Sequence, residues 1–156
     1  MKAYATTLVL LSAIGVAAAP AEARTNWQGE AFITSAVGTT CAADGWTPGG
    51  HGLITVMPAN MDNNGTSSYI ALHIGRRNAY SLKVSGALGG NKAYTAVGIT
   101  SAGSNFTFSG SLATFVTAPT SVTTNTNSFE TTFSVTNWAG NAGCTVTFNG
   151  ALVKRR

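Results

Sequence analysis

Charged residues are scarce in this chain, at 9% of its 156 amino acids, whereas soluble proteins usually carry about 25%. So low a charge content argues against a disordered chain, a coiled coil and a helical bundle. The chain has instead 18 glycines, together with abundant threonine, serine and asparagine. This composition suits short strands joined by turns, and it predicts an all-β protein.

No apolar run is long enough for a membrane-spanning helix, which needs about 20 residues. The longest stretch, residues 8–19, follows a basic residue, Lys2, and is followed by a small-x-small triplet at 21–23. A positive residue, a short apolar stretch and such a triplet are the parts of a secretory signal peptide. We therefore predict a signal peptide over 1–23 and a single exported β domain over 24–156. The protein is expected to be secreted or periplasmic, with no transmembrane segment in the mature chain.

Only two cysteines occur, Cys41 and Cys144, and they form no CxxC pair of the kind that zinc or redox sites use. In an exported protein an even number of cysteines predicts disulfide bonding, because the compartment is oxidising. Cys41 follows the first expected strand and Cys144 precedes the last one. A bridge between them therefore predicts that these two strands lie side by side and run antiparallel.

Short runs of alternating apolar and polar residues predict strands along the whole chain. The first covers residues 27–37, and a loop rich in glycine and proline follows at 42–50. Further strands are expected at 52–57, 69–74, 79–84, 94–100, 129–135 and 146–152. Residues 105–109 and 112–117 predict either a tight hairpin or one bent strand with a bulge.

About eight to ten short strands follow from this pattern, with no helical period between them. Turns recur at the short spacing that antiparallel all-β folds show. We therefore predict an antiparallel β-sandwich or jelly roll that carries one disulfide. A closed β-barrel is the alternative.

Motifs for catalysis and for metal binding are missing. No serine stands in a GxSxG context, no two carboxylates share a short motif, and the loop at 60–64 offers one acid to a cation. We therefore predict no catalytic residue, no metal site and no cofactor. His51, at the edge of the loop at 42–50, is kept as a weak candidate for a binding site. His73 alternates with apolar neighbours and is expected to face solvent or a polar crevice within a sheet.

Basic residues outnumber acidic ones, and the formal net charge is +4. Arg76 and Arg77 stand together in a predicted turn, but the basic residues form no stripe along the chain. Binding to nucleic acid needs such a basic face, so no nucleic-acid partner is predicted. The partner is unknown, and a glycan, an anionic surface and another protein are all compatible with this charge.

Two tryptophans stand in loops close to the two cysteines. Trp46 follows Cys41 by five residues, and Trp138 precedes Cys144 by six. If the disulfide forms, both indoles lie at the same end of the molecule, where they either stack on a ligand or cover the bridge. The candidate ligand-binding residues are therefore Trp46, Trp138, His51, Arg76 and Arg77.

The preferred function is a non-catalytic exported β-sandwich domain with a surface-binding or structural role, whose ligand is unknown. The alternative is a small secreted hydrolase. A groove that holds His51 or His73 with a carboxylate favours the hydrolase. A flat face with exposed tryptophan and arginine favours binding.

Overall fold

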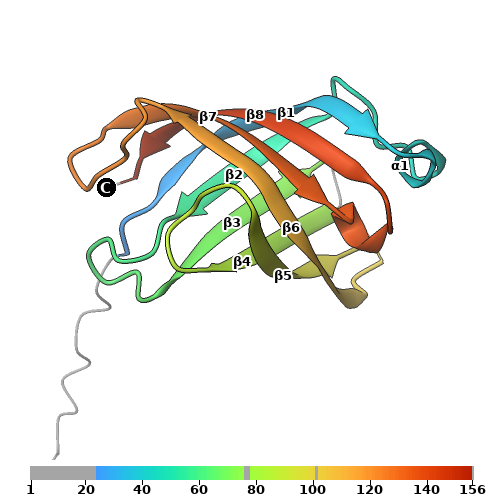
Figure 1. Cartoon of the computed structure of the whole chain (residues 1–156), viewed down its shortest axis with the longest axis horizontal. Helices are drawn as coiled ribbons and strands as arrows, with labels where there is room; N and C mark the ends of the chain where they lie inside the picture. The colour runs from blue at the N-terminus through green and yellow to red at the C-terminus, as the bar shows by residue number, and fades with distance from the viewer. Residues whose placement is uncertain (1–23, 76–77, 101, 156) are drawn as a thin grey trace, which may run out of the picture.

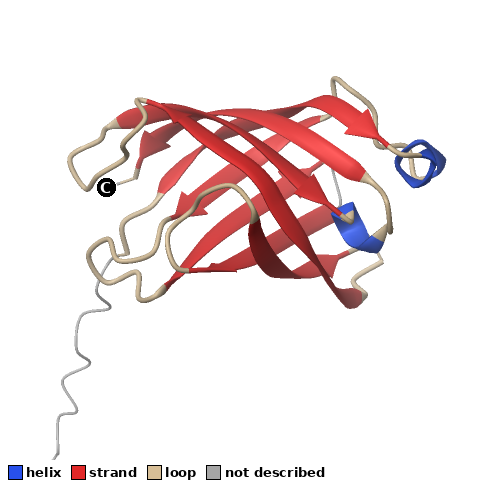
Figure 2. Cartoon of the chain, in the orientation of Figure 1, coloured by secondary structure: helices blue, strands red, loops and turns tan. Residues whose placement is uncertain are grey.

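Eight antiparallel strands close into a barrel in the computed structural model, which describes residues 24–75, 78–100 and 102–155 (Figure 1). Figure 2 shows how little helix accompanies them, a short α1 (Thr39–Ala43) and a 3-10 turn η1 (Trp138–Gly140). The strands are β1 (Trp27–Val37), β2 (His51–Met57), β3 (Ser67–Ile74), β4 (Asn78–Ser85), β5 (Lys92–Ile99), β6 (Asn105–Ala118), β7 (Ser128–Thr136) and β8 (Thr145–Lys154).

Each strand pairs with its neighbours in the sequence, and β1 closes the ring by pairing with both β2 and β8. The predicted all-β antiparallel fold and the predicted contact between first and last strands are confirmed. The architecture is the closed barrel, the alternative to the preferred sandwich. Both folds alternate apolar and polar residues along each strand, so this pattern does not separate them. They differ in whether both edges of the first strand are paired.

Strand β6 settles the choice left open for residues 105–117. The chain runs as one strand through Gly110 and Ser111, and its register against β7 shifts between Leu112 and Thr114. A Cβ at position 110 would overlap the carbonyl oxygen of Thr136. Glycine is therefore needed here for close approach of two strands and not for a hairpin turn. The bent strand with a bulge is the correct form.

Apolar side chains fill the interior of the barrel. In β4, for example, Leu82 and Val84 are fully buried, whereas Ser81 and Lys83, which alternate with them, are exposed. Burying one such aliphatic side chain stabilises a fold by about 1.5 to 3 kcal/mol. The largest fully buried side chains include Trp27, Trp138, Tyr94, Phe133, Phe148, Leu72 and Leu152. The interior is thus a packed core, as eight strands allow.

The loops divide between the two ends of the barrel. One end, here called the disulfide end, carries α1, η1 and the loops 38–50 and 137–144, on the right of Figure 1. The other, here called the pocket end, carries the loops 58–66, 86–91 and 119–127. The described chain also begins and finishes at the pocket end, where the amide of Arg155 donates to the carbonyl oxygen of Asn26 at 2.9 Å.

Candidate functional site

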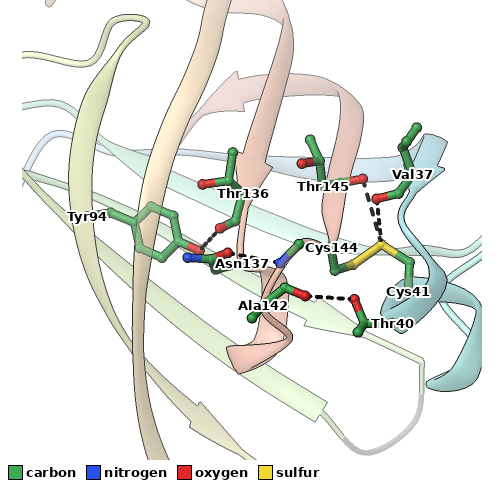
Figure 3. The surroundings of a disulfide bond; sticks show 10 residues. Val37, Thr40, Cys41, Tyr94, Thr136, Asn137, Ala142, Cys144 and Thr145 are labelled. Carbon is green, nitrogen blue, oxygen red and sulfur yellow. Dashed lines mark hydrogen bonds between the residues drawn. A yellow bond between two sulfur atoms is a disulfide. The ribbon is translucent and has the colours of Figure 1, made fainter.

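The predicted disulfide is present at the disulfide end. Cys41 and Cys144 are bonded across 103 residues of sequence, with their Cα atoms 5.0 Å apart (Figure 3). Both side chains are buried. The hydroxyl of Thr40 in α1 donates to the carbonyl oxygen of Ala142 at 3.1 Å. The bridge and this hydrogen bond together fix the loop after β1 against the loop before β8.

Aromatic rings fill the barrel beneath this bridge. The ring centroid of Trp138 lies 5.6 Å from that of Trp46 and 4.7 Å from that of Tyr80. Phe106 and Phe108 of β6 stack on each other at 5.6 Å, and Phe108 lies 6.3 Å from Trp138. We call these five residues the aromatic cluster. It places the two indoles at the same end of the molecule, as predicted from their spacing to the cysteines.

The two tryptophans differ in what they expose. Trp138 has no accessible surface, and its amide donates to the carbonyl oxygen of Cys144 at 3.1 Å. Trp46 is half-buried, and its amide donates to the carbonyl oxygen of Cys41 at 3.0 Å. A fully buried indole presents no face on which a ligand can stack. The burial of Trp138 therefore favours the second of its two predicted roles, in which the indole covers the disulfide and does not stack on a ligand.

The histidines lie on the outer face of the barrel. The register sets Glu30 of β1, Leu53 of β2 and His73 of β3 side by side, and His51 pairs with Phe32. Glu30, His51 and His73 line one shallow depression, and all three are exposed. None of the described residues that line it has a hydroxyl or a thiol. The depression thus brings a carboxylate and two imidazoles together without a nucleophile, and Leu53 stands between Glu30 and His73.

Two of the predicted candidates, Arg76 and Arg77, lie outside the described residues, as does the predicted signal peptide at 1–23. Among the residues that the structure does describe, no group of three histidine, cysteine, aspartate or glutamate side chains is placed to hold a metal ion. In the same part of the chain, no helix is both long and apolar enough to cross a membrane.

A pocket of about 300 Å³ opens at the pocket end, which sequence reasoning did not single out. Its base is formed by buried side chains of the barrel, Val56 and Phe129. The ring of Phe129 packs edge-on against Trp27, with centroids 5.7 Å apart. The full lining comprises Val56, Pro58, Ala59, Met61, Ala87, Leu88, Phe115, Val116, Thr117, Thr120, Val122 and Phe129.

The three loops around this pocket are each held by a side chain. In the loop 58–66, Asn64 donates from Nδ2 to two carbonyl oxygens, that of Pro58 at 2.9 Å and that of Thr25, before β1, at 2.6 Å. The Nζ of Lys92 donates to the carbonyl oxygen of Ala87 at 2.6 Å, in the loop 86–91. Two side chains hold the loop 119–127. Trp27 Nε1 donates to the carbonyl oxygen of Thr126, and Lys154 Nζ donates to the carbonyl oxygen of Thr124. The pocket is therefore preformed.

A signal for this pocket does exist in the sequence. Met61, Leu88 and Val122 are apolar residues in three separate loops, all partly buried against the core. The order of strands in an antiparallel meander brings these loops to the same end. Apolar residues that recur in alternate loops therefore indicate an apolar mouth, once the meander is known.

Comparison of the chain with models of protein families, with curated proteins and with solved structures finds no significant match. The geometry of the two ends is thus the ground on which a function is assigned. Function has to be argued from such a site, because a fold alone does not specify it.

Proposed function

We propose that this protein is an exported, non-catalytic β-barrel domain that binds a small apolar molecule in the pocket at the pocket end. The observation that carries the proposal is the chemistry of the lining. Ten of its twelve residues are apolar and the other two are threonines, Thr117 and Thr120. None of the described residues that line the space carries a carboxylate, an imidazole or an amine. Such a lining favours the burial of the apolar surface of a ligand, and these residues include no group for general acid or base catalysis.

The size and rigidity of the pocket agree with this proposal. A space of about 300 Å³ stands at the lower end of the range of small-molecule sites. Eight-stranded barrels either fill their interior with side chains or hold one small ligand. This barrel is filled at the disulfide end by the aromatic cluster, and it leaves space at the pocket end. Loops already held by hydrogen bonds lose little entropy when the ligand binds.

Export is the second part of the proposal. It rests on the signal-like residues at 1–23 and is supported by the disulfide between Cys41 and Cys144. Disulfides persist in secreted and periplasmic proteins, whereas cytosolic thiols are kept reduced. Intact mass of the exported protein tests this part. A chain that begins near Arg24 is expected, and a mass that includes residues 1–23 would contradict it.

A small hydrolase is the second candidate, because Glu30, His51 and His73 share one depression. Catalytic groups usually stand in a cleft that excludes water, whereas these three side chains are exposed on a convex sheet face. We therefore rank this candidate below ligand binding. A screen against ester, amide and glycoside substrates, with His51→Ala and His73→Ala as controls, tests it. Turnover that both variants abolish would establish the hydrolase.

Binding of a neutral fluorescent probe, N-phenylnaphthylamine, tests the pocket. Thr120 is exposed and lines the pocket, so Thr120→Trp adds bulk to the mouth without altering the core. Ser121, the next residue, is also exposed and lies outside the lining, so Ser121→Trp is the matched control. We expect saturable binding to the wild type and to the control, and at least tenfold weaker binding to Thr120→Trp. Equal affinity in all three proteins would refute the pocket as the site.

A further inference from the structure

Among the residues that the structure describes, basic side chains gather at the pocket end. The structure describes five basic residues, and four of them lie there, namely Arg24, Lys92, Lys154 and Arg155. The fifth, Lys83, is on the outer face of β4. The acids nearest to this end are Asp62 in the loop 58–66, and Glu30 of β1 and Glu130 of β7, which both lie opposite Ala151 of β8. Four positive charges against three negative ones leave this end with a small positive excess.

One of these cations stands at the rim itself. Lys92 is the first residue of β5 and is partly buried. Its ammonium lies 2.6 Å from the carbonyl oxygen of Ala87, and Ala87 lines the pocket. Gly86 and Gly89 lie beside the end of this side chain, since a Cβ at position 86 would stand 3.7 Å from its Nζ and one at position 89 would stand 3.7 Å from its Cε. An ammonium has three N–H donors, and the carbonyl uses one of them.

The other charges of this end are placed differently. Lys154 donates to the carbonyl oxygen of Thr124, which is outside the lining. Arg155 donates from Nε to the Oε1 of Gln28, on the outer face of β1, at 2.8 Å. The carboxylate of Asp62 accepts a hydrogen bond from the hydroxyl of Thr25. Among the described basic side chains of this end, Lys92 is the one that donates a hydrogen bond to a residue of the lining, and this places it to meet the polar end of a molecule seated in the pocket.

We infer that the ligand is an anionic amphiphile, whose apolar part fills the pocket and whose carboxylate or similar head binds the ammonium of Lys92. This inference rests on the proposed function. An apolar molecule in the pocket has to project any charged group through the mouth, since the described residues of the lining offer it no charged partner. At the mouth a negative head gains a charge-assisted hydrogen bond from Lys92 and the attraction of the surrounding cations.

Calorimetric titration of the purified protein with decanoate and with decanol tests the inference, because the two molecules share one apolar chain and differ in the head. Lys92→Met removes the charge and keeps most of the apolar stem. Lys83→Met removes the same charge from the outer face and is the matched control. A partly exposed ion pair contributes up to about 1 kcal/mol, which is roughly fivefold in affinity.

We expect decanoate to bind the wild type and Lys83→Met about fivefold more tightly than decanol does. In Lys92→Met this preference should vanish while the affinity for decanol stays the same, and in the wild type it should shrink as salt is added. Equal binding of both molecules to the wild type, or an unchanged preference in Lys92→Met, overturns the inference and leaves the pocket intact. Failure of both molecules to bind overturns the proposed function itself.

Discussion

The two ends of the barrel are held together in different ways. At the disulfide end a covalent bridge and the aromatic cluster fill the interior, and Trp138 has no exposed surface. At the pocket end hydrogen bonds from Asn64, Lys92 and Trp27 hold the loops, and a space of about 300 Å³ is left open. The comparison assigns stability to one end and ligand binding to the other. Changes at the disulfide end should therefore affect folding alone.

Removal of the bridge is expected to have the largest effect. In the chain-entropy model, a bridge across 103 residues stabilises the folded state by about 4 to 5 kcal/mol. The double variant Cys41→Ser with Cys144→Ser should lose most of this in urea unfolding. Its affinity for N-phenylnaphthylamine, measured under conditions where it stays folded, should match the wild type. An unchanged free energy of unfolding would show that the bridge does not stabilise the disulfide end.

Truncation of a side chain in the aromatic cluster should have the next largest effect on stability. Trp138→Ala removes a fully buried indole, a change that typically costs about 3 to 5 kcal/mol. Trp46 is half-buried, so Trp46→Ala should cost clearly less in the same unfolding experiment. Neither change should weaken binding of the probe to the folded protein. If Trp46→Ala abolishes binding at little cost in stability, the ligand site belongs to the disulfide end and the comparison fails.

The alkaline titration of Tyr80 should be a smaller effect of the same packing. Burial, and after it the negative charge of Asp44, raises the pKa of Tyr80 from 10.0 to about 12. A phenol whose pKa is higher in the folded chain stabilises the fold below pH 10.0, and this contribution is lost as the pH rises to about 12. Stability of the wild type should therefore fall across this range.

Tyr80→Phe keeps the ring and removes the titrating hydroxyl, so the fall between these two pH values should become shallower. Burial also raises the pKa of Tyr94, whose hydroxyl donates to the carbonyl oxygen of Thr136 at 2.7 Å, so some pH dependence should remain. Asp44→Asn removes the smaller cause and should move the titration of Tyr80 only slightly towards lower pH. Ultraviolet absorbance of tyrosinate follows each variant. An identical profile for Tyr80→Phe and the wild type would argue against a buried phenol.

Local patterns in the sequence were enough to predict much of the fold. The strand predicted at 27–37 coincides with β1, and the single pair of cysteines sufficed for the disulfide. Barrel closure was not predictable from alternation, because it depends on whether β1 pairs along both edges. Such a pairing joins residues more than 100 positions apart, for example Trp27 with Lys154.

The candidate site was harder to predict than the fold. The turn-rich stretch around Trp138 left open whether its ring stacks on a ligand or covers the bridge. In the structure Asn137 and Ala139 adopt left-handed backbone conformations, with φ of 52° and 54°, on either side of an indole that is buried. The pocket depends on three loops that meet only in the folded barrel. An apolar residue in one of these loops, such as Leu88, is unexceptional by itself. Its meaning comes from the neighbours that the topology supplies.

The position of the bound ligand tests the central claim most directly. Amide chemical shifts of the assigned, isotope-labelled protein, followed by NMR during titration with N-phenylnaphthylamine, report which residues the ligand reaches. We expect the largest changes in the loops 58–66, 86–91 and 119–127, and small changes at the disulfide end. Changes concentrated in the loops 38–50 and 137–144, around Trp46, would contradict the division of the barrel into a stabilising end and a binding end.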